Sequence, residues 1–144
     1  MSVQLRSFPC PGCSEFINTS KTSCPFCSTP IDAVAAQSAA EVQEKVNDAY
    51  NDASHLRIIA GVYLLLLILG RVPFLSTAAR LGSFGGFLAV PILFVRWHIK
   101  YAGINTTDPD YARAKKLKNI ALLMWAAQTL AVVIIVALIM MSSL

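Results

Sequence analysis

Charged side chains are scarce in this sequence of 144 residues, at 14% against about 25% in typical soluble domains. Acidic residues are scarcest beyond residue 55, where the sequence has only Asp108 and Asp110 but nine lysines and arginines. The apolar fraction is 56%, above the usual value of about 45–50%. This composition argues against an ordinary soluble enzyme and against a disordered chain. It indicates a membrane protein with a small polar part.

Features that enzymes commonly need are also missing. No Ser, His and Asp arrangement suggests nucleophilic catalysis, and all four cysteines belong to one motif described below. The glycines at 82–86 lie within an apolar segment and do not form a phosphate-binding loop. Residues 1–30 lack the apolar stretch of about 7–15 residues that a signal peptide needs. We therefore expect a protein that is not an enzyme, that binds no small-molecule substrate, and whose N-terminus stays on the side where it is made.

The polar N-terminal part divides into two segments. Residues 1–29 have too few large apolar side chains for a core of their own, and domains below about 40 residues usually need a metal or disulfides. Residues 30–55 are predicted to form an amphipathic linker helix, with Thr29 as N-cap and Pro30 as the first helical residue. Its small apolar residues repeat in steps of three and four, as in a coiled coil, at Ala35, Ala39, Val42, Val46, Ala49, Ala53 and Leu56. This stripe is expected either to lie on the protein's own surface or to dock on another helix.

Residues 56–144 are predicted to form a membrane domain with three spans, at about 56–75, 81–97 and 119–141. The second segment contains Gly82 and Gly86, whose spacing gives a small face for close helix packing. That segment can alternatively be re-entrant. The fold class is therefore mainly α, a three-span helical integral membrane protein with a small polar N-terminal segment and an amphipathic linker helix.

The most specific motif consists of Cys10-Pro-Gly-Cys13 and Cys24-Pro-Phe-Cys27, which are separated by ten residues. Each Cys-x2-Cys pair can form a tight turn, called a knuckle, and two facing knuckles supply four thiolates to a tetrahedral ion. The intervening residues suffice for a short hairpin with a turn at 18–21. Structural zinc is the leading interpretation, and rubredoxin-like iron, two disulfides or a dithiol redox pair are the alternatives.

This segment, about residues 8–30, resembles the bacterial zinc-ribbon family, in which a short N-terminal ribbon is often fused to membrane or signalling modules. The resemblance implies one zinc ion bound by Cys10, Cys13, Cys24 and Cys27. The sequence departs from the family pattern after each second cysteine. Glycine is usual there because a positive φ is common, whereas this chain has Ser14 and Ser28.

The basic residues predict the orientation in the membrane. Seven lie at the ribbon end of the spans, whereas only Arg71 and Arg80 lie at the other end. The positive-inside rule then places the N-terminus and the loop 98–118 in the cytoplasm and the C-terminus outside, in a bacterial-type inner membrane. We interpret Arg71 and Arg80 as snorkelling anchors, with lipid phosphate or a partner carboxylate as the alternative. One basic run is expected to contact anionic lipid headgroups or to fix topology, at Arg113, Lys115, Lys116 and Lys118.

These features favour a zinc-ribbon interaction module or accessory subunit of a larger membrane complex. Its expected partners are membrane lipids and another protein. The alternative is a membrane-bound regulator whose ribbon senses metal or binds nucleic acid, although Arg6 and Lys21 offer few phosphate contacts and nucleic acid is not expected. A small redox or transport component is the third class. It would need iron, a haem between His55 and His98, or an ionisable group within a span.

Overall fold

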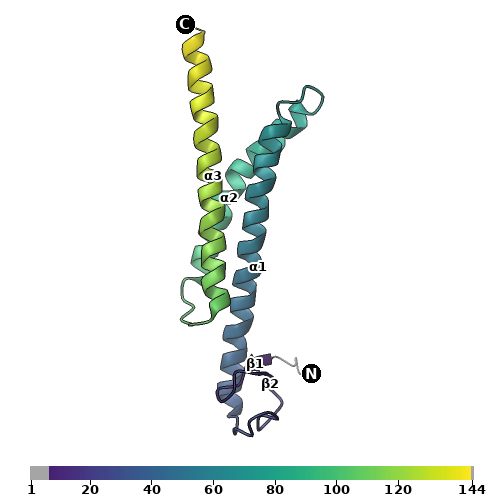
Figure 1. The fold of residues 1–144 in the computed structure, drawn as a ribbon, viewed down its shortest axis with the longest axis vertical. Helices are drawn as coiled ribbons and strands as arrows, with labels where there is room; N and C mark the ends of the chain where they lie inside the picture. Colours follow the sequence, from purple (N-terminus) through teal and green to yellow (C-terminus); the bar gives the residue numbers. More distant parts are fainter. Residues whose placement is uncertain (1–6, 144) are drawn as a thin grey trace.

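The computed structural model describes residues 7–143, so the first six residues of the predicted 1–29 segment lie outside the described part. Two short strands, β1 (Ser7–Pro9) and β2 (Phe16–Asn18), pair antiparallel at the N-terminal end. Three long helices follow, α1 (Ala33–Leu69), α2 (Ser76–Tyr101) and α3 (Pro109–Ser142). Figure 1 shows an elongated molecule in which the small sheet sits at the start of α1, while α3 diverges from the α1–α2 hairpin at the opposite end.

The predicted linker helix and first span form one continuous helix. α1 has 37 residues and is about 55 Å long at the usual helical rise. Its N-cap is Asp32, whose side chain accepts a hydrogen bond from the Val34 N–H, so the prediction of Thr29 as cap was wrong. Pro30 instead pairs with Ser23 in an isolated β-bridge. The helix also ends earlier than residue 75, because the chain turns after Leu69.

The other two apolar segments are also unbroken helices. α2 runs through Pro91 without interruption, and it shows no reversal of the kind a re-entrant segment needs. α3 begins where the sequence predicts, with Pro109 in its first turn and the Asp108 side chain accepting from the Asp110 N–H. All three helices are long and apolar enough to cross a membrane. The predicted 98–118 connection is shorter than expected, because helix occupies all of it except residues 102–108.

Glycines allow α2 to pack closely on α1. A Cβ atom on Gly82 would lie 3.0 Å from a Leu66 methyl carbon, and one on Gly86 would lie 3.0 Å from the Tyr63 side chain. In contrast, a Cβ atom on Gly85 would meet nothing within 4 Å. The small face at Gly82 and Gly86 is therefore turned toward α1.

The halves of the three helices nearest the two-stranded sheet share a core. Its buried members are Val46, Ala49, Ala53, Trp97, Tyr101, Tyr111 and Ala114. The C-terminal part of the predicted alanine stripe thus packs within the protein's own fold. The N-terminal part is shifted by one residue, because Ala36 and Ala40 are buried whereas Ala35 and Val42 are exposed.

Hydrogen bonds from buried and partly buried side chains connect the helices to one another. The Trp97 indole N–H donates to the Ala49 carbonyl at 2.9 Å, and the Trp125 indole N–H donates to the Phe87 carbonyl at 3.0 Å. Within the apolar region, Gln128 Nε2 donates to the Ala60 carbonyl at 3.4 Å. These bonds link α2 to α1, α3 to α2 and α3 to α1.

Candidate metal centre

Two turns of the same design hold the cysteines. In the first, the Ser14 N–H donates to the Cys10 carbonyl at 2.8 Å, and in the second the Ser28 N–H donates to the Cys24 carbonyl at 2.9 Å. Both serines have a positive φ, 62° at Ser14 and 58° at Ser28. The chain therefore adopts the backbone that favours glycine at these two positions, although it carries serine there.

Each turn is closed by a second backbone bond. The Cys10 N–H donates to the Glu15 carbonyl, and the Cys24 N–H donates to the Thr29 carbonyl, both at 2.9 Å. The first turn connects β1 to β2, so the hairpin encloses the first knuckle instead of lying between the two knuckles. The predicted turn at 18–21 is present, with the Lys21 N–H donating to the Asn18 carbonyl at 3.1 Å.

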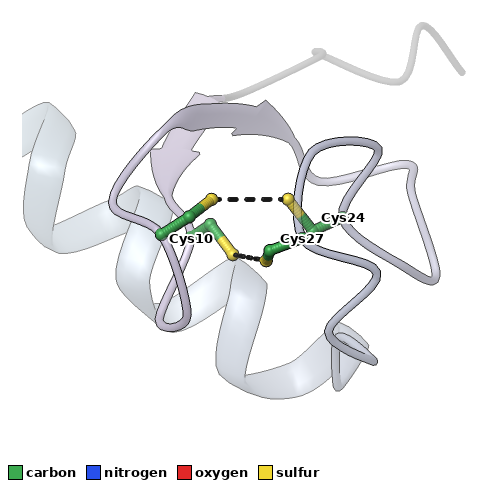
Figure 2. Close-up of side chains that lie close together, drawn as sticks. Cys10, Cys24 and Cys27 are labelled. Atoms are coloured by element: carbon green, nitrogen blue, oxygen red, sulfur yellow. Dashed lines mark hydrogen bonds between the residues drawn. The ribbon is translucent and has the colours of Figure 1, made fainter.

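The four sulfur atoms converge on one point. They all lie within 4.8 Å of one another, and Figure 2 shows the side chains turned toward each other from two facing loops. Sγ of Cys10 is 3.6 Å from Sγ of Cys27, and Sγ of Cys13 is 3.7 Å from Sγ of Cys24. Ideal tetrahedral coordination with metal–sulfur bonds of about 2.3 Å places sulfurs about 3.8 Å apart. The spacing therefore suits a single tetrahedral ion.

The surroundings of Cys27 and Cys13 shift the pKa values of these two thiols in opposite directions. The Thr29 hydroxyl lies 3.1 Å from Cys27 Sγ, and hydrogen bonds from this hydroxyl and from the Thr29 backbone lower the pKa of Cys27 to about 6. The Glu15 backbone N–H acts to lower the pKa of Cys13, but burial and the neighbouring thiols outweigh it and raise the pKa to about 12. Bound metal deprotonates coordinating thiols outright, so a cation would remove this difference.

The residues before α1, 7–31, form a small head that carries the cysteines and packs against α1. Phe8 and Ile17, one from each strand, are buried with Cys10 and Cys24. Their cluster includes Ala36 and Ala40 of α1, whose small side chains let the head approach the helix. Cys13 is partly buried and Cys27 is exposed. The centre thus lies at the edge of a small core, with one ligand facing outward.

This arrangement leaves a bound ion no open coordination position, because four thiolates complete a tetrahedral shell. Sites of this type are structural and do not activate water or substrate. Within residues 7–143, the four cysteines are the one group of three or more potential His, Cys, Asp or Glu ligands close enough to share a metal.

The basic run lies near the N-terminal end of α3, and its side chains have different surroundings. Lys118 is only 7% exposed, and its ammonium lies 4.7 Å from the ring centre of Phe94 and 4.5 Å from that of Trp97. Arg113 pairs with Asp110 at 3.0 Å, and Lys115 lies over the Tyr111 ring. Lys116 is exposed. A common lipid-facing role for the whole run does not fit Lys118, which packs inward on aromatic rings.

Two residues of the centre have no counterpart in the sequence-based prediction. A Cβ atom on Gly12 would lie 2.5 Å from Thr29 Oγ1, so this glycine lets the two knuckles meet. Thr29 contacts Cys27, although the sequence suggested a helix cap. The sequence could have identified Thr29 by its position: it lies two residues after Cys27, as Glu15 lies two residues after Cys13.

Comparison with known proteins adds no family to this description, because no family model, no curated protein and no solved structure matches the chain.

Proposed function

We propose that this chain is a membrane-anchored zinc-ribbon protein, not an enzyme, that acts as an interaction module or accessory subunit of a larger membrane complex. The observation that carries the proposal is the closed four-cysteine centre, packed on a helix that continues into an apolar segment long enough to cross a membrane. Such a centre stabilises a small surface at a fixed position near the bilayer.

Zinc is the metal that best fits the ligand set. Four thiolates at tetrahedral spacing are typical of structural zinc, and a closed shell needs neither redox change nor an open site. The predicted cytoplasmic location also keeps thiols reduced, which disfavours disulfides. Iron bound by the same four sulfurs is the alternative that metal analysis distinguishes.

The head presents two exposed aromatic side chains. Phe16 in β2 is 60% exposed, and Phe26 within the second knuckle is 66% exposed. Aromatic residues are enriched among the energetically dominant contacts of protein interfaces. Because the metal centre and the α1 contact fix the backbone around both rings, this surface suits recognition of another protein.

Site-specific photo-cross-linking in the native membrane tests the proposal. A photoreactive phenylalanine analogue replaces Phe16 or Phe26, and the same analogue at Phe74 is the matched control. Phe74 is 96% exposed and lies in the α1–α2 turn, at the end of α1 remote from the ribbon.

We expect positions 16 and 26, but not 74, to cross-link to a protein that also comigrates stoichiometrically with this chain on native gels. The cross-link should disappear in the Cys10→Ser, Cys24→Ser double variant. A chain that migrates alone and forms no cross-link from the head would contradict the proposal.

A further inference from the structure

A groove of about 600 Å³ opens between α1 and α3 at the end remote from the ribbon. Figure 1 shows α3 diverging there from the α1–α2 hairpin. The walls of the groove are mostly apolar, with Leu67 and Ile68 on α1 facing Val132 and Ile135 on α3. Side chains of this kind accept hydrocarbon more readily than polar material.

Two cations line the same groove. Arg71 follows the end of α1, and Arg80 lies in the first turns of α2. They are close to one another in the fold, because Arg80 Cγ lies 3.9 Å from the position a Cβ atom on Gly70 would take. Neither arginine forms an ion pair within the part of the chain that the structure describes. The groove therefore combines a long apolar wall with two guanidinium groups that lack a carboxylate partner.

The dimensions of the groove correspond to one lipid leaflet. Along α3 its lining extends from Gln128 to Ile139. Eleven helical steps of about 1.5 Å cover about 16 Å. Half of a bilayer hydrocarbon core of about 30 Å is about 15 Å. An acyl chain lying along this wall would therefore have its glycerol and phosphate near the arginines.

We propose that the groove binds one anionic phospholipid, with an acyl chain between α1 and α3 and its phosphate held by Arg71 and Arg80. Guanidinium groups bind phosphate through paired, charge-assisted hydrogen bonds. The inference requires that the helices lie in a bilayer, but neither the metal nor the protein partner of the proposed function. Its failure would leave that function untouched.

A second copy of this chain is a poor occupant of the groove. Residues 56–107 and 111–143 contain no Asp or Glu, so the apolar helices of another copy offer no carboxylate to Arg71 or Arg80. Packing two copies through this face would bring like charges together, which costs free energy in a medium of low dielectric constant.

Native mass spectrometry of the full chain in detergent tests the proposal. The protein is offered phosphatidylglycerol, phosphatidylcholine or inorganic phosphate. We expect one retained phosphatidylglycerol, and Arg71→Gln with Arg80→Gln should weaken its binding at least about tenfold. The matched control, Arg57→Gln with Arg113→Gln, removes two arginines outside the groove and should retain the lipid.

A second variant tests the apolar wall with both arginines intact. Ala131 lines the groove, and Ala131→Trp should fill it and reduce retention of phosphatidylglycerol by a similar factor. Retention that is equal for phosphatidylcholine, or full competition by inorganic phosphate, would overturn the proposal. A lipid-free dimer that Ala131→Trp abolishes would overturn it as well.

Discussion

Gly12 and Thr29 lie in contact across the two cysteine knuckles: a Cβ atom on residue 12 would come 2.5 Å from Thr29 Oγ1 and 3.2 Å from Cys27 Sγ. Real Cβ atoms do not tolerate the shorter distance, so a side chain at residue 12 would require Thr29 or the backbone of the knuckles to move. The equivalent position of the second knuckle carries Phe26, which points outward. The two knuckles therefore have similar backbones, but residue 12 faces the other knuckle whereas residue 26 faces outward.

Substitution Gly12→Ala is expected to weaken metal binding, because the added methyl group forces the knuckles apart. Overpacking of this kind typically costs about 1–3 kcal/mol, which corresponds to at least a several-fold loss of affinity. Competition with a chromophoric chelator measures it on the intact chain. Phe26→Ala is the control and should leave the affinity unchanged. Equal metal affinities for wild type and Gly12→Ala would show that the space between residue 12 and Thr29 does not limit metal binding.

Substitutions Ser14→Gly and Ser28→Gly are expected to stabilise the head. A non-glycine residue in the left-handed region costs about 1–2 kcal/mol, and the greater freedom of glycine in the unfolded chain offsets about 0.5–1 kcal/mol of the gain. Each change should therefore raise stability by up to about 1.5 kcal/mol. Chelator competition or thermal unfolding of the metal-loaded protein measures the change. A loss of affinity would mean that the serine hydroxyls contribute more than the backbone strain costs.

Neighbouring glycines of α2 provide a test of helix packing. Gly86→Leu should disrupt the contact with Tyr63, where a Cβ atom would already be 3.0 Å away, and should destabilise the α1–α2 pair by about 1–3 kcal/mol. Gly85→Leu should have little effect, because that side faces open space. Unfolding of both variants in a denaturing detergent series compares them. Equal destabilisation would place the small face elsewhere.

Acid should loosen the contact between α1 and α2 near the ribbon. Burial acts to raise the pKa of Asp52, but the Tyr101 hydroxyl at 2.6 Å and the Lys100 ammonium at 3.2 Å outweigh it and hold the pKa below its usual value. Because the folded pKa is lowered, this stabilisation is complete above the ordinary pKa of about 3.9 and is lost as the pH falls through the folded value.

Substitution Asp52→Asn should therefore reduce stability near neutral pH, by at most about 1 kcal/mol because the Asp52 side chain is 47% exposed and solvent screens its interactions. It should also remove the part of the acid dependence that lies below about pH 4. Unfolding followed between about pH 7 and about pH 2, a range that extends well below the ordinary carboxyl pKa of about 3.9, measures both effects. The exposed Asp48 provides the control substitution, Asp48→Asn. An unchanged pH profile for Asp52→Asn would show that the Tyr101 hydrogen bond contributes no stability.

The four-cysteine cluster could be predicted from sequence because each of its two turns is formed by residues that are neighbours in the chain. Two Cys-x2-Cys pairs specify two knuckles wherever they fold, and even the positive φ at Ser14 and Ser28 follows from the position after each second cysteine. The start of α3 was predictable for the same reason, since Asp108 and Pro109 act within one turn.

The start of α1 depends on a contact that lies outside the helix. Pro30 fits the first turn of a helix, but its bridge with Ser23 keeps it in extended backbone and moves the cap to Asp32. The alanine stripe gave a weak periodic signal, because alanines occupy several faces of the helix. Docking of the strands then decided that Ala36 and Ala40 are buried.

The aromatic surroundings of Lys118 could not be predicted from the sequence. It belongs to a basic run that resembles an ordinary lipid-facing segment, yet the rings of Phe94 and Trp97 enclose its ammonium group. Those aromatic residues lie on another helix, so no local pattern identifies them as its partners.

The most direct test of the account is the metal content of the full chain, purified in mild detergent without added metal. Element analysis combined with native mass spectrometry should find one zinc ion per chain in the wild type and none in the Cys10→Ser, Cys24→Ser variant. Stoichiometric iron with visible colour would show that the four cysteines bind iron and not zinc. A metal-free chain that contains two disulfides would contradict the metal centre itself.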